Sequence, residues 1–412
     1  MTEPSLSAAD ARRAAIAAWE PTLGAIVATD ETAFDALEAG EGSLAGVAVG
    51  VKDVIDVAGF ATRNGSAACE DAAPAHRDAA VVAALRAAGA AIVAKTASTE
   101  FAFTDPTSTL NPHDPAATPG GSSSGSGAAV GAGALDLALG TQTAGSLCRP
   151  AAYCGAVGFK PSRGALSTEG MTPLAPSFDT IGFIARDVAL AKAAFAACGG
   201  DVSAPETPAG MSVARAATDP AAPVTPEASA ALEAAQTRLG RLGVETGAAP
   251  QVVDLAAVVA DHRTVMLAEA ADSHGPSLQG REALLRPNFR AALEEGRSLA
   301  PAKVAGARAR LAEARVRFWE AVAAFDALIT LPTPGAAPDR AGGTGYQHLL
   351  TPWTVFGGPL VCLPWGADAG GRPLSVMLAA RPGADASLLA LAARLEAEAP
   401  RRPAPALSRA SA

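Results

Sequence analysis

The sequence predicts an α/β fold, because segments with strand character alternate with segments with helix character. A β-rich segment at 46–59 is followed by a helix-like segment, for which Asp78 is the expected N-cap, and by an apolar strand at 91–95. A strand–helix–strand unit of this kind is typical of a parallel sheet, because the helix returns the chain to begin a second strand in the same direction. Two later segments, 326–330 and 359–364, are predicted to be strands of the same sheet.

The other elements follow from apolar periodicity and from breaker residues. Helix character is found in four further segments, the first with Ser7 as a suitable N-cap: 7–19, 128–139, 227–242 and 301–325. The segment 200–225 is rich in Pro, Ala and Thr, so we expect a surface loop or linker there.

Composition excludes several classes of function. The formal net charge of −9 argues against a broad basic surface, so no nucleic-acid partner is expected. The five cysteines are scattered, with no CxxC pair and no Cys/His cluster, so neither a disulfide framework nor a metal site is predicted. No apolar run is long enough for a membrane span, and residues 1–20 lack an apolar leader stretch. We therefore expect a cytoplasmic protein without a membrane partner.

The glycine- and serine-rich tract at 120–127 has three general interpretations. It resembles a flexible linker in composition, but it runs directly into an apolar, helix-like segment. Gly125, Gly127 and Gly131 suggest a dinucleotide-binding loop, although their spacing does not match that motif. The third interpretation is a hydrolase elbow, G-x-S-x-G, with Ser123 at its centre. Such an elbow needs a strand directly before it, and here a proline-rich polar loop precedes the tract.

A serine that acts through histidine would also need a histidine partner. Three histidines are candidates, but none stands in a distinctive sequence setting, and a packing or surface role is the simpler interpretation for each: His262, His274 and His348.

Three polar residues in apolar or glycine-rich settings carry the decisive pattern. Lys52 stands in GVAVGVKDVIDVAG, Ser122 in PGGSSSGSG and Ser146 in LALGTQTAGSLCRPAAYCG. With these motifs in this order, the sequence resembles the amidase signature family, the Ser-cisSer-Lys amidohydrolases. The resemblance is dense from about 45 to 190 and continues to about 397.

The resemblance implies an amidase signature fold, with a large mixed, mostly parallel β-sheet covered by helices on both faces. It implies one domain over 1–398, with the signature core at 45–190 and a flexible tail at 399–412. A homodimer is also implied, as is an enzyme with no cofactor and no metal that acts on a small-molecule amide. Because no further domain follows the closing helix, we expect a stand-alone amidase. The alternative is an ammonia-generating subunit of a transamidation complex; a scaffold with a dead site is disfavoured because all three positions are filled.

The family assigns a role to each motif residue. Ser146 would be the nucleophile that forms an acyl-enzyme, and Ser122, after a cis peptide bond, would pass a proton between Ser146 and Lys52. Lys52 must be neutral to accept that proton, and burial among Val and Ile side chains has the right sign to lower its pKa. Ser123 would either orient Lys52 or Ser122 or serve only to form the turn. The oxyanion hole would be formed by backbone N–H groups of a short loop: Thr143, Ala144, Gly145 and Ser146.

The acyl group is the least determined part of the prediction. The sequence is most similar to small bacterial malonamidase-type amidases, so malonamate or another small acid is one expected substrate. Arg149, three residues after the nucleophile, would then bind the substrate carboxylate. The alternative for Arg149 is a structural arginine that bonds loop carbonyls. Ala144 and Cys148 depart from the commonest family pattern, which keeps neutral aliphatic, aryl and carbamate substrates as alternatives.

Overall fold

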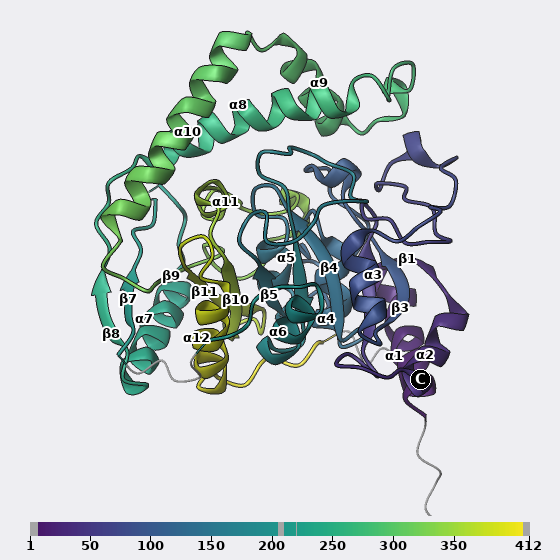
Figure 1. Cartoon of the computed structure of the whole chain (residues 1–412), viewed down its shortest axis with the longest axis horizontal. Coiled ribbons are helices and arrows are strands. Elements are labelled where there is room, and N and C mark those ends of the chain that lie inside the picture. Colours follow the sequence, from purple (N-terminus) through teal and green to yellow (C-terminus); the bar gives the residue numbers. More distant parts are fainter. Residues whose placement is uncertain (1–6, 205–209, 220, 407–412) are drawn as a thin grey trace, which may run out of the picture.

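A computed structural model describes residues 7–204, 210–219 and 221–406 (Figure 1). Among these residues one 11-stranded sheet runs through the molecule in the order β1-β3-β2-β4-β6-β5-β10-β11-β9-β7-β8. The strands are β1 (Ile26–Thr29), β2 (Ala48–Lys52), β3 (Ala91–Thr96), β4 (Leu137–Gln142), β5 (Val157–Lys160), β6 (Thr180–Ala185), β7 (Ser212–Arg215), β8 (Glu245–Ala248), β9 (Ala327–Thr330), β10 (Leu360–Ala367) and β11 (Pro373–Ala379).

The large mixed α/β fold that the sequence predicts is confirmed, but the sheet is not mostly parallel. Parallel pairing is confined to the β3-β2-β4 group and the β9-β7-β8 group. The strands between these groups, and β1 at one edge, pair antiparallel with their neighbours. The mostly parallel sheet that the resemblance implied is therefore wrong, because parallel pairing is limited to these two groups.

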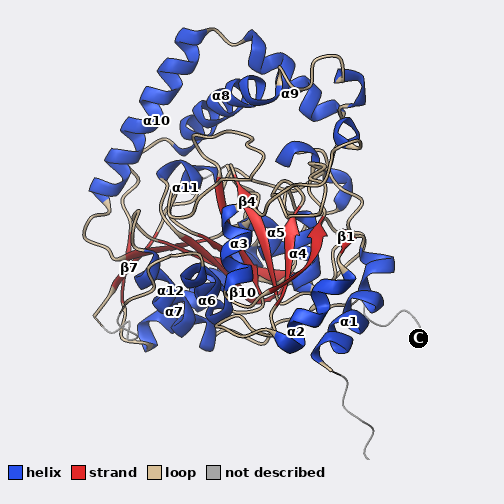
Figure 2. Ribbon diagram, turned by 45° about the vertical axis from the view of Figure 1, so that its right-hand side comes forward, coloured by secondary structure: helices blue, strands red, loops and turns tan. Residues whose placement is uncertain are grey.

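Helices cover both faces of the sheet, as expected (Figure 2). Gly158 and Phe159 are neighbours on β5, so their side-chain positions face opposite sides. A Cβ on Gly158 would lie 2.8 Å from Ala151 of α5, whereas the Phe159 ring lies 5.2 Å from that of Phe195 in α6. The helices are α1 (Ala8–Leu23), α2 (Ala36–Ala39), α3 (Ala80–Ala87), α4 (Ser124–Gly131), α5 (Cys148–Tyr153), α6 (Val188–Ala197), α7 (Pro226–Arg241), α8 (Leu255–His274), α9 (Pro287–Ser298), α10 (Pro301–Ala321), α11 (Thr351–Phe356) and α12 (Asp385–Ala397).

Helices α8, α9 and α10 form an arm that extends from the sheet and passes over one edge of it (Figure 1). The arm is attached to the body through α11, where the Phe318 ring of α10 stacks on Phe356 with 4.0 Å between ring centroids. No helix in the described part of the chain combines the length and the apolar character that a membrane span requires.

Several predicted elements are confirmed and others need correction. Ser7 caps α1 by accepting a hydrogen bond from the Asp10 N–H, as expected. Asp78 does not cap α3; its carboxylate instead accepts from the Ala58 N–H and from Arg86. The run 128–139, predicted as one helix, is the end of α4 followed by the start of β4.

The two segments predicted as linker and tail both make contacts with the rest of the fold. The predicted linker at 200–225 contains strand β7, although 205–209 and 220 lie outside the described residues. The predicted flexible tail is bonded to the body as far as residue 406, since Ala406 donates to the Pro112 carbonyl. Residues 407–412 lie outside the described part of the chain.

Candidate active site

The three motif residues are brought together at the ends of two parallel strands. Lys52 is the last residue of β2, and the loop 143–146 follows the last residue of its neighbour β4. Parallel neighbours end at the same edge of a sheet, so both segments lie on one side of the molecule. Ser122 reaches the same place from the tract that leads into α4, and the arm passes over this edge (Figure 1).

Lys52 is fully buried, and its amine is hydrogen-bonded to two hydroxyl groups. Its Nζ atom lies 2.6 Å from Ser122 Oγ and 2.6 Å from Thr141 Oγ1. Burial lowers the pKa of Lys52 to about 7, and the negative charge of Asp179 opposes this shift. The adjacent Asp53 faces the other side of the strand and pairs with Lys95, as alternation along β2 predicts. A substantial neutral fraction at pH 7 is therefore available for proton transfer.

The peptide bond that precedes Ser122 is held from two sides. The Gly121–Ser122 bond is cis. The Gly121 carbonyl accepts from Nε and Nη2 of Arg149, at 3.2 Å and 2.7 Å, and the Ser122 carbonyl accepts from the Thr99 N–H. These contacts hold the Ser122 hydroxyl against the lysine.

Ser146 lies in a loop whose carbonyl groups are hydrogen-bonded and whose N–H groups are not. All four carbonyls of 143–146 accept hydrogen bonds, from His262, Thr354, the Arg149 N–H and the Ser123 N–H. In contrast, the N–H groups of Thr143, Ala144, Gly145 and Ser146 donate to no group in the described residues, and the next N–H, that of Leu147, donates to Gln142. Buried N–H groups are rarely left unpaired. Four in succession form an arrangement suited to binding an oxyanion.

The hydroxyls of Ser122 and Ser146 are not joined by a hydrogen bond. The segments that carry them are neighbours through a backbone contact. The Ser123 N–H donates to the Ser146 carbonyl over 3.1 Å, which holds the tract against the loop. The Ser123 hydroxyl contacts neither Lys52 nor Ser122; it exchanges long hydrogen bonds with the backbone of Thr141. Since Thr141 also bonds Lys52, the Ser123 hydroxyl is linked to the lysine through Thr141 and not by a direct hydrogen bond.

Arg149 does not face an open substrate pocket. Its side chain is 1% exposed, and its guanidinium donates to the carbonyls of Gly121 and Gly345 and to Thr344 Oγ1. Burial lowers its pKa to about 10, so it remains charged at neutral pH. Because its donors are largely occupied by loop carbonyls, the geometry favours the structural alternative for Arg149 over carboxylate binding.

Four further residues of the site were not predicted from the sequence. Asp179 accepts from the Thr143 hydroxyl at 2.5 Å, and His262 of α8 lies 2.8 Å from the Thr143 carbonyl. Thr141 bonds Lys52, and Thr354 of α11 donates to the Ala144 carbonyl. Thr141 stands within the motif that contains Ser146, and Asp179 lies in the range of dense resemblance, 45–190, so both could have been found there. His262 and Thr354 are more than 110 positions from their partners, so no local pattern marks them.

A cleft between the arm and the body adjoins the site through His262, which bonds the Thr143 carbonyl, although none of Lys52, Ser122 and Ser146 lines it. It has a volume of ≈ 380 Å³, within the usual range for small-molecule sites. Residues from both sides line it, among them Phe103, Met266, Ala292, Gln347 and His262. Two charged residues of the lining, Arg263 and Glu295, are paired with each other.

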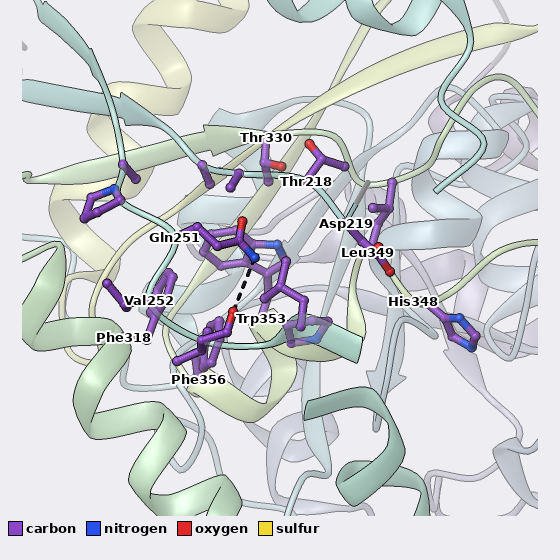
Figure 3. A pocket seen from close by; sticks show the side chains of 17 residues that line it. Thr218, Asp219, Gln251, Val252, Phe318, Thr330, His348, Leu349, Trp353 and Phe356 are labelled. Carbon is purple, nitrogen blue, oxygen red and sulfur yellow. Dashed lines mark hydrogen bonds between the residues drawn. The ribbon is translucent and has the colours of Figure 1, made fainter. Parts of the chain in front are cut away.

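A second pocket is lined by a different set of residues (Figure 3). Apolar side chains such as Phe318, Trp353 and Phe356 form most of its wall, and Gln251 of the lining donates to the Val253 carbonyl. None of the three predicted catalytic residues lines it, and His348 is shared with the cleft.

No group of His, Cys, Asp and Glu side chains in the described residues is arranged to hold a metal ion. All five cysteines are free. Burial raises the pKa of Cys154 above its usual range, so this thiol, close to the site, is poorly suited to act as a nucleophile.

Comparison with known proteins places this fold in the class of amide-hydrolysing enzymes. The chain belongs to the Amidase family, since the profile of that family matches residues 2–389. It is 32% identical over 391 residues to the putative amidase AmiD of Mycobacterium tuberculosis, which covers 83% of this chain and 77% of AmiD. A shorter match, 47% identical over 155 residues and 36% of each chain, is to a glutamyl-tRNA(Gln) amidotransferase subunit of Methanospirillum hungatei.

A solved structure supports the same assignment. The native peptide amidase of Stenotrophomonas maltophilia superposes with a TM-score of 0.82 at 26% identity, covering 96% of this chain and 94% of that one. The predicted resemblance to the amidase signature family is thus confirmed. The finer likeness to malonamidase-type enzymes stays a prediction.

Proposed function

We propose that the protein hydrolyses linear carboxylic amides through a Ser146 acyl-enzyme, with a proton relay through Ser122 to Lys52. The observation that carries this proposal is the buried Lys52 amine, 2.6 Å from Ser122 Oγ and with its pKa lowered to about 7. An amine near half deprotonation at neutral pH is a suitable terminal base.

The proposed steps use these three side chains in turn. Ser146 Oγ attacks the carbonyl carbon, while its proton passes to Ser122 Oγ and the Ser122 proton passes to Lys52 Nζ. The negative oxygen that forms accepts from the unpaired N–H groups of 144–146. The C–N bond then breaks, and the same relay returns the proton to the leaving amine. Water repeats the sequence on the acyl-enzyme and releases the acid.

We further propose that the substrate is a neutral amide rather than a carboxylate-bearing one such as malonamate. Arg149, the cation expected to bind a carboxylate, is buried against loop carbonyls. The charged pair in the cleft lining, Arg263 and Glu295, is internally neutralised. An anionic substrate would therefore be desolvated without a dedicated cationic partner, which is unfavourable.

The ammonia-generating subunit remains a second candidate. The 155-residue match to a subunit of a glutamyl-tRNA(Gln) amidotransferase supports it. A subunit of that kind would depend on partner proteins. Hydrolysis of free amides by the isolated chain, with no partner present, would argue for the stand-alone enzyme.

The test is a comparison of matched amides on the purified chain. We expect butyramide to be hydrolysed faster than succinamate, the half-amide of similar length, and intact-mass spectrometry to detect an acyl adduct on Ser146. The Ser146→Ala variant should form no adduct and release no ammonia. Faster turnover of succinamate would contradict the proposal of a neutral substrate. An acyl adduct on the Ser146→Ala variant would contradict the assignment of Ser146 as the nucleophile.

A further inference from the structure

We infer that His262 and Thr354 are positioning residues that orient the oxyanion hole by holding the carbonyls of Thr143 and Ala144. This inference rests on the proposed function, because it concerns the same acyl-transfer site. Neither side chain needs to contact the substrate for this role. Both act through the peptide units of the loop that precedes Ser146.

His262 holds the first peptide unit. Its Nε2 atom lies 2.8 Å from the Thr143 carbonyl oxygen, and the residue is 3% exposed. Because a carbonyl can only accept, Nε2 must carry the proton. Burial lowers the pKa of His262 to about 4, so the ring is neutral near pH 7 and keeps this single donor. The Phe178 ring, with its centroid 4.4 Å away, restricts the imidazole from the side.

Thr354 holds the second peptide unit. Its hydroxyl donates to the Ala144 carbonyl over 2.6 Å and accepts from the Gln142 side-chain amide over 3.0 Å. The oxygen of the Gln142 side chain accepts from the backbone N–H groups of Leu147 and Cys148. Thr354 thus links the end of β4 to the loop and to the start of α5.

The geometry of the peptide unit turns these contacts into control of the donors. In a trans peptide the C=O of one residue and the N–H of the next point in opposite directions. Holding the Thr143 carbonyl on the α8 side therefore directs the Ala144 N–H away from α8, and holding the Ala144 carbonyl directs the Gly145 N–H away from Thr354. These are two of the four N–H groups of the loop 143–146 that have no acceptor in the described residues.

The consequence is a role for the arm in the chemistry of the site. His262 belongs to α8, which lies over the sheet edge, and it also lines the cleft. The loop 143–146 has its full set of carbonyl partners only while α8 is docked. The arm would then contribute to turnover as well as to substrate enclosure.

The test uses two pairs of variants. His262→Phe and Thr354→Val keep side-chain volume but remove the donor, whereas His262→Gln and Thr354→Ser retain one. Removing a hydrogen-bond donor from an oxyanion hole lowers kcat by roughly 100- to 1,000-fold, so misorienting one should lower it by about 10- to 100-fold. We expect this loss in kcat with a nearly unchanged KM, and recovery of most of it in the Gln and Ser variants.

His274 provides the matched control. It is a buried histidine of the same helix, and its Nε2 also bonds a backbone carbonyl, that of Pro173, but it does not touch the loop. His274→Phe should leave kcat near the wild-type value. Wild-type kcat in His262→Phe, or an equal loss in His262→Phe and His262→Gln, would overturn this inference alone. A wild-type protein that neither hydrolyses amides nor forms an adduct on Ser146 would overturn the proposed function and this inference with it.

Discussion

Lys52 Nζ lies 2.6 Å from Ser122 Oγ, and both residues are shielded from solvent. The two residues are 70 positions apart and meet because the tract before α4 crosses the ends of β2 and β4. Within the described residues no carboxylate lies close enough to pair with the amine; Asp179 acts on it only from a distance. The site therefore favours the neutral form of the lysine far more than water does.

The first prediction concerns the pH dependence of the rate. With the Lys52 pKa near 7, the active neutral form increases as pH rises, so kcat/KM should climb up to about tenfold per unit below pH 7 and level off above about pH 8. The measurement is a pH profile on a neutral amide. The residual activity of Lys52→Ala should not show this rise of kcat/KM with pH. A flat wild-type profile between pH 5.5 and 8 would contradict the assignment of the base.

The second prediction separates the two candidate nucleophiles. Ser146→Ala should abolish labelling by a fluorophosphonate, whereas Ser123→Ala should still be labelled, because the Ser123 hydroxyl contacts only the Thr141 backbone. Intact-mass spectrometry gives the labelled fraction. Ser124→Ala is a suitable control, since that hydroxyl bonds the Gly120 carbonyl. Loss of labelling in Ser123→Ala with retention in Ser146→Ala would favour the hydrolase-elbow interpretation.

The third prediction concerns Arg149. Arg149→Gln should lower the turnover of butyramide and succinamate by similar factors, because the guanidinium holds the Gly121 carbonyl next to Ser122. The variant should also be less stable, by about 1–3 kcal/mol for the buried carbonyls left without donors. Kinetics on both substrates and a urea titration measure these effects. A loss confined to succinamate would restore the carboxylate-binding role.

The fourth prediction is independence from metal ions. The relay of Ser146, Ser122 and Lys52 supplies nucleophile, proton carrier and base, so dialysis against a strong chelator should leave the hydrolysis rate unchanged. The measurement is the rate before and after dialysis, with metal content followed by elemental analysis. A proportional loss that zinc restores would show that the relay alone is insufficient.

The sequence predicted the local parts of the site better than the distant ones. Lys52, Ser122 and Ser146 each stand in a short motif. In the structure Lys52 is hydrogen-bonded to Ser122, and Ser146 lies in a loop whose N–H groups are unpaired. His262 and Thr354 contact that loop only because α8 and α11 pack over it. No periodicity within one segment encodes such a contact, so these residues were beyond sequence-based prediction.

The same division applies to the fold. The β2–α3–β3 unit was predictable because strand, helix and strand follow one another and pair locally. Strand β4 was mistaken for part of a helix, since its Leu and Ala residues are good helix formers. Its extended form depends on pairing with β2 and β6, whose residues lie far away in the sequence.

The last prediction links the site to stability. The Lys52 pKa is about 7 in the folded protein and about 10.5 when unfolded, so between these values the unfolded chain binds a proton that the folded protein does not. Stability therefore falls as pH decreases from 10.5 towards 7. Lys52→Met removes this cost at similar side-chain volume and also removes the contacts to Ser122 and Thr141, a loss that should change little with pH.

The stability of Lys52→Met relative to wild type should therefore increase by about 1.4 kcal/mol for each unit of pH lowered between 9.5 and 7.5. Urea unfolding of both proteins at several pH values measures the difference. Lys303→Met, which changes an exposed lysine of α10, is the control and should track the wild type. A difference that does not vary with pH would mean that Lys52 stays charged in the folded protein, and a charged lysine could not accept the proton from Ser122.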